Sequence, residues 1–135
     1  MQAANKKQLG KYAREWGDIA EDIASNYLAG LGLPVLERKW SPRGGHKEID
    51  IICQQGDTII FVEVKARSGR DESPLDAINR KKMNNIFRCA DSYLRTLPGT
   101  HWQYRFDIIT LEGTPENYTL QHIEDAFLGP LISYR

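Results

Sequence analysis

Two apolar segments, residues 48–55 and 58–67, flank the dipeptide Gly56-Asp57 and form the clearest pattern of hydrophobic and polar positions in the chain. Both segments are rich in Ile, Val or Phe, and Gly-Asp between such runs is typical of a two-residue hairpin turn. A turn of known length fixes the register of the two predicted strands. One face of this hairpin is then wholly apolar, and its cross-strand pairs are Cys53 with Ile60, Ile51 with Val62, and Ile49 with Val64.

The other face of the predicted hairpin is apolar near the turn and charged at its open end. There the register places Asp50 opposite Glu63 and Glu48 opposite Lys65. Like charges that face each other across a sheet are destabilising, by roughly 0.2 to 1 kcal/mol at exposed sites. Three carboxylates against one ammonium make an oxygen-rich negative patch, which is what a hard divalent cation such as Mg²⁺ requires. The simpler alternative is that these four residues form the solvated face of an edge hairpin.

Two longer segments, residues 9–31 and 75–97, show the apolar spacing of amphipathic helices, and glycine or proline follows each of them. Residues 1–8 are polar, and we expect them to be disordered. Further apolar runs predict three strands, at residues 33–40, 102–111 and 118–122. The order helix, strand, hairpin, helix, strand, strand predicts a single α/β domain over residues 1–135. Its core is a central mixed sheet of about five strands flanked by helices.

Composition supports one soluble globular domain, because 41% of the 135 residues are hydrophobic and 27% are charged. No apolar run approaches the roughly 20 residues that span a bilayer, and the N-terminal residues lack the apolar core of a signal peptide. We therefore expect a cytoplasmic protein with no membrane segment. Cys53 and Cys89 lack the spacing of a zinc site and are predicted to be core thiols. Arg105 and Asp107 project from one side of a predicted strand, so an ion pair within the sheet is the simplest interpretation, and a role in a functional site is the alternative.

Charge limits how the chain can bind nucleic acid. Eighteen Lys and Arg residues balance eighteen Asp and Glu residues, so the protein as a whole exerts no general attraction on a phosphate backbone. Binding of that kind would need a local basic patch. Residues 41–47, SPRGGHK, form one candidate loop, which is either a phosphate-binding loop that includes Arg43 or a plain polar connection.

Two charged residues occupy unexpected positions on the predicted helices. Glu21 lies at the margin of the apolar stripe of the first helix, where a solvated residue is the ordinary case. Lys82 lies four residues from both Ile78 and Ile86, within the apolar stripe of the second helix. It either extends past the edge of the core or points into a functional site.

The motifs of the hairpin resemble those of a known group of enzymes. Asp50, followed after twelve residues by Glu63-Val64-Lys65, resembles the D...(D/E)xK signature of the PD-(D/E)xK nuclease superfamily. The segments KEIDII, FVEVKAR, RFDII and DAF resemble, more narrowly, the YraN-like family of predicted endonuclease-fold proteins, over nearly the whole chain. The proline that usually precedes the aspartate is absent, and Glu48-Ile49 stands in its place.

This resemblance implies a restriction-endonuclease-like fold and a metal site. Glu21 matches the acidic residue of the first helix that reaches the site in such folds, and Lys82 matches a lysine of the second helix in YraN-like proteins. The expected ligands of Mg²⁺ or Mn²⁺ are Asp50 and Glu63, with help from Glu48 or Glu21. Lys65 would orient or deprotonate the attacking water, or neutralise the charge that develops on the phosphate.

The resulting hypothesis is a metal-dependent endonuclease that hydrolyses phosphodiester bonds in nucleic acid, with DNA as the expected substrate and with structure rather than sequence directing it. A homodimer is a possible assembly, because small nucleases often need two subunits to straddle a duplex. The alternative is a nuclease-fold module that binds nucleic acid or a DNA-processing protein without cutting. The residues expected to contact phosphates are Lys82, Arg67, Lys81, Arg80 and Arg43.

Overall fold

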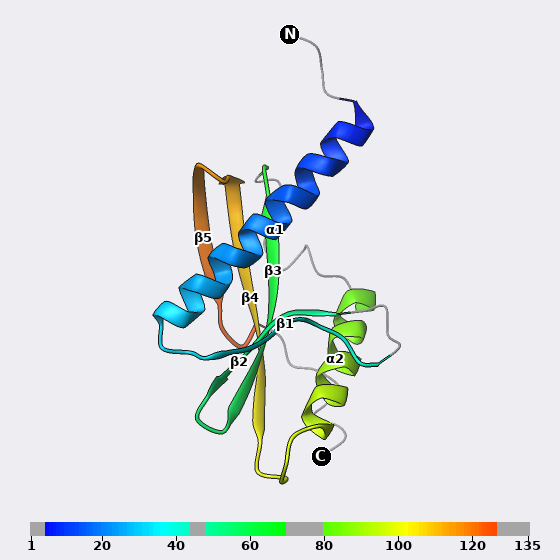
Figure 1. Cartoon of the computed structure of the whole chain (residues 1–135), viewed down its shortest axis with the longest axis vertical. Coiled ribbons are helices and arrows are strands. Elements are labelled where there is room, and N and C mark those ends of the chain that lie inside the picture. The colour runs from blue at the N-terminus through cyan, green and yellow to red at the C-terminus, as the bar shows by residue number, and fades with distance from the viewer. Residues whose placement is uncertain (1–4, 44–47, 70–79, 127–135) are drawn as a thin grey trace.

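The computed structural model describes residues 5–43, 48–69 and 80–126, and Figure 1 shows the arrangement of its helices and strands. The five strands form one sheet in the order β1-β2-β3-β4-β5, in which only β3 and β4 are parallel. The predicted mixed five-stranded α/β sheet with flanking helices is confirmed, and it is consistent with a restriction-endonuclease-like fold. The elements are α1 (Lys6–Gly30), β1 (Val35–Trp40), β2 (Ile49–Gln55), β3 (Thr58–Arg67), α2 (Arg80–Arg95), β4 (Gln103–Thr114) and β5 (Asn117–Ile123).

Helix α1 begins earlier than the apolar pattern suggested. The Asn5 side chain accepts a hydrogen bond from the Gln8 amide at 2.9 Å, and the Gln8 side chain accepts one from the Asn5 amide at 3.0 Å. This reciprocal capping box satisfies two main-chain donors that a helix start leaves open. The prediction of disorder was therefore wrong for residues 5–8, while residues 1–4 lie outside the described part of the chain. The first turns of α1 extend beyond the ends of β3 and β4 (Figure 1).

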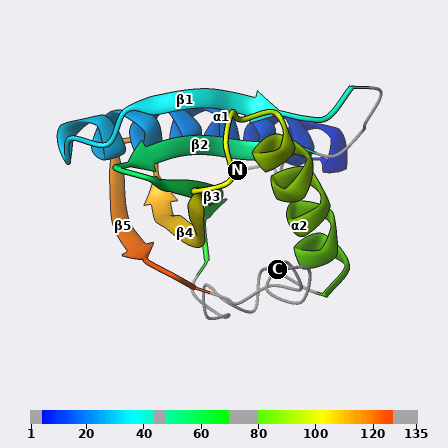
Figure 2. The same ribbon diagram turned by 90° about the horizontal axis from the view of Figure 1, so that it is seen from below.

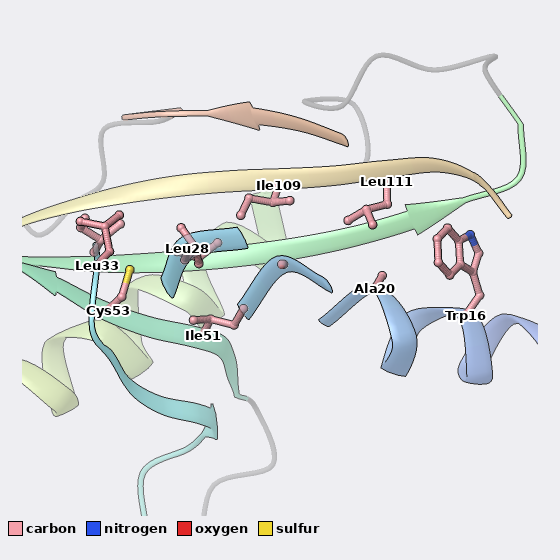
Figure 3. Close-up of a cluster of buried hydrophobic side chains, with 11 residues drawn as sticks. Trp16, Ala20, Leu28, Leu33, Ile51, Cys53, Ile109 and Leu111 are labelled. Carbon is pink, nitrogen blue, oxygen red and sulfur yellow. The ribbon is translucent and has the colours of Figure 1, made fainter. Parts of the chain in front are cut away.

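The two faces of the sheet carry separate apolar cores. Small residues of α1, Ala20 and Ala24, are fully buried and let the helix lie close to the sheet. Figure 3 shows the cluster on this face, which we call the α1-side core; its buried members are Trp16, Ala20, Ala24, Leu28, Leu33, Ile51, Cys53, Ile60, Val62, Ile109 and Leu111. The α2-side core comprises Ile49, Ile52, Ile59, Phe61, Ile86, Phe87, Cys89, Ala90, Tyr93 and Phe106. Figure 2 gives the view from below, in which α1 and α2 are seen to approach the sheet from different sides.

The predicted hairpin is confirmed near its turn and wrong at its open end. Gln55 pairs with Thr58 across the two-residue loop, and Gly56 has a φ of +59°, which a glycine adopts without strain. The antiparallel ladder of β2 and β3 ends at the pair of Ile51 with Val62, so the pairs predicted beyond it do not form. Ile49 belongs to the α2-side core and not to the α1 face on which the register had placed it.

The remaining elements agree with the pattern except at their ends. The second helix is described from Arg80, so predicted residues 75–79, with Ile78 among them, fall outside the described chain. Cys53 and Cys89 are buried thiols outside any disulfide, as expected of core cysteines. Burial and the charge of Asp107 raise the pKa of the Cys53 thiol to about 12, so the thiol stays protonated at neutral pH. Among the described helices none is long and apolar enough to cross a membrane.

Candidate metal and phosphate site

Asp50 lies where the two strands of the hairpin separate. Beyond the last pair of the ladder, β2 continues beside β1 through the pair of Trp40 with Ile49, whereas β3 continues beside β4 as far as Arg67. The main-chain amide of Val64 therefore has no acceptor on β2, and it donates to Oδ2 of Asp50 at 2.8 Å instead. A side chain thus replaces one rung of the ladder, and the strands form a fork with a carboxylate at its base.

Glu63 reaches the same fork from β3 on the α2 side of the sheet. The residue is only 5% exposed, and Nζ of Lys82 lies 3.3 Å from its Oε1. Burial raises the pKa of this carboxyl well above its usual range, and the charge of Asp50 and a hydrogen bond with Asp50 raise it further, against the opposing effect of Lys82. Oε2 is buried and has no hydrogen-bond donor in the described part of the chain. The two carboxyl groups are thus close enough to share a proton or a cation.

Glu21 approaches from α1, on the opposite face of the sheet. The residue is 6% exposed, and burial followed by the charge of Asp50 raises the pKa of its carboxyl. Nζ of Lys39 lies 3.2 Å from Oε2 and Nη2 of Arg38 lies 3.6 Å from Oε1; both cations oppose the rise. Oε1 is buried without a hydrogen-bond donor among the described residues. Glu21 is therefore no solvated flank of the helix.

The two cations beside Glu21 come from an irregular strand. Neighbouring side chains of a regular strand point to opposite faces, yet Arg38 and Lys39 of β1 both contact Glu21. Lys39 has a φ of +51°, in the left-handed region, and this backbone reversal brings its side chain to the same side as that of Arg38. The sequence showed only that Arg38 and Lys39 lie close to the basic residues of the 41–47 loop. Nothing in its alternation indicates which carboxylate they contact.

The other predicted site residues lie at different distances from the fork. Glu48 is exposed, so Glu21 is the better candidate for a third carboxylate. Lys65 is half-buried on β3, level with Thr110 of β4, and makes no ion pair with any described residue. Nζ of Lys82 lies 3.3 Å from Glu63, so this lysine extends towards the fork. Arg67 lines a separate cleft near the end of β3.

A basic cleft of about 540 Å³ runs along the outer side of α2. Two residues predicted to contact phosphate, Arg80 and Lys81, are exposed there. Arg43 is exposed in the segment that follows β1, and within the described ranges it makes no ion pair with the carboxylates. The residues that line the cleft are Arg80, Lys81, Asn84, Asn85 and Arg88.

The carboxylates fit a metal ion that two protein ligands hold together with water and substrate, and in the part of the chain that the structure describes they do not form a site with three protein ligands. Within the described ranges no three His, Cys, Asp or Glu side chains form a ready-made metal-binding cluster. Mg²⁺, however, is usually held by one or two carboxylates, with water and substrate phosphate completing its octahedron. Asp50 and Glu63 provide such a pair, and the buried Glu63 Oε2 has an unused lone pair. Glu21 lies near enough for the charge of Asp50 to affect its pKa, but it is turned towards Arg38 and Lys39.

A family model described as "Uncharacterised protein family UPF0102" matches residues 20–111, which is more than half of the chain. The chain belongs to the UPF0102 family. This family is the YraN-like group that the hairpin motifs resemble. The matched part of this UPF0102 chain begins one residue before Glu21 and includes Asp50, Glu63, Lys65 and Lys82.

Curated relatives cover most of the same chain. A UPF0102 protein of Chlorobium chlorochromatii is 42% identical over 120 residues, which are 84% of this chain and 91% of the relative. One from Alkaliphilus oremlandii is 40% identical over 114 residues, 82% of this chain and 96% of the relative. One from Phocaeicola vulgatus is 38% identical over 118 residues, 87% of this chain and 95% of the relative.

A second buried polar group in this UPF0102 protein lies on the α1 side, away from Glu63. Asp107 is fully buried and accepts hydrogen bonds from Nε of Arg105 at 2.9 Å and from the Asp125 amide at 3.0 Å. Nε2 of His122 lies 2.8 Å from its Oδ2, and the hydroxyl of Tyr27 lies 3.0 Å from Nδ1 of the same ring. The predicted Arg105–Asp107 pair is confirmed. The sequence did not show that α1 and β5 contribute to it.

Proposed function

We propose that this UPF0102 protein is a Mg²⁺- or Mn²⁺-dependent phosphodiesterase of the PD-(D/E)xK type that cleaves nucleic acid, with DNA as the substrate. The observation that carries the proposal is the pair of carboxylates at the fork, where Asp50 accepts from the Val64 amide and the neighbouring Glu63 is buried with Oε2 lacking a donor among the described residues. Glu21 from α1 and Glu63 from β3 are buried, and the charge of Asp50 raises the pKa of both. Buried like charges are costly to keep unless they serve a purpose such as cation binding.

Each side chain at the fork has a chemical task in this proposal. Asp50 and Glu63 hold the metal, with Glu21 as the third acid. The bound metal supplies Lewis acidity, which polarises the phosphate and lowers the pKa of a coordinated water. Lys65 follows Glu63 by two residues on the same strand and so projects on the same side. Its ammonium group orients the attacking water or stabilises the negative charge that develops on the phosphate.

The basic cleft on α2 binds the flanking part of the substrate. Arginine and lysine contacts to phosphate oxygens position a nucleic acid without reading its sequence. Arg80, Lys81 and Arg88 carry the charge of this cleft, and Lys82 on the same helix contacts Glu63. One helix therefore connects phosphate binding with the carboxylates. No base-reading element is needed, which is why substrate structure rather than sequence directs the proposed cleavage.

The test is a cleavage assay with branched, single-stranded and duplex DNA in the presence of Mn²⁺ or Mg²⁺. Asp50→Asn is the sharpest variant, because asparagine keeps an oxygen that can accept from the Val64 amide while it removes the charge. We expect metal-stimulated cleavage that Asp50→Asn and Glu63→Gln abolish and that the control Glu15→Gln, at an exposed position of α1, leaves intact. Absence of metal-stimulated cleavage of every substrate, or full activity of Asp50→Asn, would contradict the proposal.

A second candidate is a nuclease-fold module that binds nucleic acid or a DNA-processing protein without cutting. One observation favours it: ammonium groups already lie beside both buried glutamates, with Lys39 at 3.2 Å from Glu21 and Lys82 at 3.3 Å from Glu63. Salt-dependent DNA binding by a protein that takes up no Mg²⁺ or Mn²⁺ in calorimetry would support this candidate over the first. The mass in solution would show at the same time whether the protein acts as a homodimer.

A further inference from the structure

A second cleft, of about 520 Å³, lies between the first turns of α1 and the end of β3. Its volume is in the range of pockets that bind small organic groups. We call it the α1–β3 cleft; it is lined by Leu9, Tyr12, Ala13 and Trp16 on one side and by Ala66, Arg67, Ser68 and Gly69 on the other. The family match begins after the α1 residues of this cleft. Neither the carboxylates nor the basic cleft on α2 includes any of these residues.

The chemistry of the α1–β3 cleft combines an aromatic surface with a cation. Tyr12 is 51% exposed and Leu9 is 58% exposed, so both present apolar surface to the cleft in the turns of α1 that extend beyond the sheet. Trp16 forms the buried end of the same wall, and it stands beyond Leu111 at the edge of the α1-side core (Figure 3). Arg67 lies on the opposite wall. A flat π-system beside a guanidinium is the arrangement that binds single-stranded nucleic acid, because every base stacks and every nucleotide carries a phosphate.

The position of the cleft relates it to the carboxylates. On α1, Trp16 precedes Glu21 by five residues and Tyr12 precedes it by nine, which corresponds to about 7 to 14 Å along the helix. On β3, Ala66 and Arg67 follow Glu63 by three and four residues, which corresponds to about 10 to 13 Å along the strand. The two elements thus lead from the fork to the cleft over similar distances. A strand with a phosphate at the fork can place a base in the cleft a few nucleotides away.

We infer that the α1–β3 cleft binds an unpaired nucleobase, which stacks on Tyr12 while Arg67 contacts an adjacent phosphate. This role rests on the proposed action on nucleic acid and narrows its substrate to strands that carry unpaired bases next to the cleavage position. A base inside a duplex is stacked on both sides and cannot enter such a cleft without being unpaired. Single strands and the single-stranded arms of branched DNA meet the requirement.

The experiment measures binding without catalysis. Oligonucleotides that carry one fluorescent aminopurine base at successive positions are titrated with protein in a metal chelator, so no strand is cut. Stacking on an aromatic ring quenches the fluorescence of this base. We expect quenching at one position in the single strand, retained in Tyr12→Phe and lost in Tyr12→Ala, with affinity reduced about 5- to 150-fold. Duplex affinity should not change. Leu31→Ala, an exposed apolar residue at the other end of α1, is the matched control.

Several results would overturn the inference, and they separate it from the proposed catalysis. Equal quenching and affinity in wild type and Tyr12→Ala would exclude base binding, even if Mg²⁺-dependent cleavage were observed. If Tyr12→Ala instead halved the mass in solution, a second copy of the chain and not a base would cover the cleft. Conversely, quenching that depends on Tyr12 in a protein that never cuts DNA would support the base-binding cleft and contradict the nuclease. A wild-type protein that binds no oligonucleotide in the chelator would overturn the base-binding cleft, and the cleavage assay with metal would still test the nuclease separately.

Discussion

Asp50 has two roles that single substitutions can separate. Its Oδ2 accepts a hydrogen bond from the Val64 amide at 2.8 Å, and its charge raises the pKa of Glu63 and Glu21. The first role stabilises the separated strands, whereas the second destabilises the metal-free protein because it opposes the ionisation of two buried acids. A neutral residue that retains an acceptor keeps the first role and removes the second.

We therefore predict that Asp50→Asn is at least as stable as wild type when no metal is present, and that Asp50→Ala loses about 1 to 2 kcal/mol because the Val64 amide is left without its acceptor. Denaturant unfolding in a chelator measures both differences. Calorimetry should show that both variants lose binding of Mn²⁺. Equal unfolding free energies for Asp50→Asn and Asp50→Ala would mean that the hydrogen bond from the Val64 amide contributes nothing to stability.

Asp107 is a buried acid whose pKa is lowered, whereas the pKa values of Glu21 and Glu63 are raised. Its burial would raise the pKa, but hydrogen bonds from His122, Arg105 and the Asp125 amide outweigh burial and lower it. A lowered folded-state pKa contributes stability that is present above the unfolded value of about 3.9 and is lost as pH falls through the folded value. The contribution of Asp107 to folding is therefore complete at neutral pH and disappears only in strong acid.

Asp107→Asn should be less stable than wild type by roughly 3 to 5 kcal/mol at pH 7, because it leaves a partly buried guanidinium without its charged partner. The difference should shrink as pH falls below about 4, where wild type loses the same contribution. Unfolding curves from pH 3 to pH 7 measure both parts. Asp91→Asn breaks the more exposed Asp91–Arg95 pair and should change stability by less than about 1 kcal/mol throughout. If the unfolding free energies of Asp107→Asn and wild type differed by the same amount from pH 3 to pH 7, the lowered pKa of Asp107 would not explain the stabilisation.

At the scale of elements, Gly113 and Gly17 lie in contrasting environments. The first is close to a tight turn and the second is within a helix. Gly113, close to the turn between β4 and β5, has a φ of +127°, and a Cβ there would lie 2.2 Å from the Asn117 carbonyl oxygen. Gly17 lies within α1, and a Cβ there would meet no atom within 4 Å. The same substitution should therefore have opposite effects at the two positions.

We predict that Gly113→Ala lowers the free energy of unfolding by about 1 to 3 kcal/mol, the usual cost of a strained backbone conformation. Gly17→Ala should raise it by about 0.5 to 1 kcal/mol, because alanine restricts the unfolded chain and favours the helix. Thermal unfolding of the two single variants and of the double variant checks the signs. A stabilised Gly113→Ala protein would show that the strand ends there rearrange freely.

The hairpin illustrates which parts of the fold a sequence can predict. Its turn and the first pairs follow from local chemistry, because Gly56-Asp57 favours one turn length and the alternation of apolar residues then fixes the register. The fork could not be predicted from the sequence. Regular pairing assumes a main-chain acceptor for the Val64 amide, and here the Asp50 side chain takes its place. The partners of Glu21 could not be predicted either, since they depend on the positive φ of Lys39. Both exceptions occur at the candidate site, where local rules are most often broken.

At the scale of the whole molecule, the charge balance makes local patches decisive. With 18 basic and 18 acidic residues, the protein has no net charge to attract DNA, so the affinity must come from a few phosphate contacts. The cleft on α2 gathers three exposed cations, Arg80, Lys81 and Arg88. Two acids that would repel a phosphate, Glu21 and Glu63, are buried. Binding should thus depend on a small number of identifiable residues.

We predict that Lys81→Ala and Arg88→Ala each weaken DNA binding to a similar extent for unrelated sequences. Each should lower the slope of log affinity against log salt by about 1, because one fewer counterion is released for each lost phosphate contact. Arg95→Ala is the control, since this arginine lies on the same helix but outside the cleft and pairs with Asp91 at 3.0 Å. Anisotropy titrations over a range of salt concentrations with two unrelated duplexes measure the slopes. A slope that Arg95→Ala changes as much as Lys81→Ala would mean that the charge of the helix as a whole, and not this cleft, attracts the phosphates.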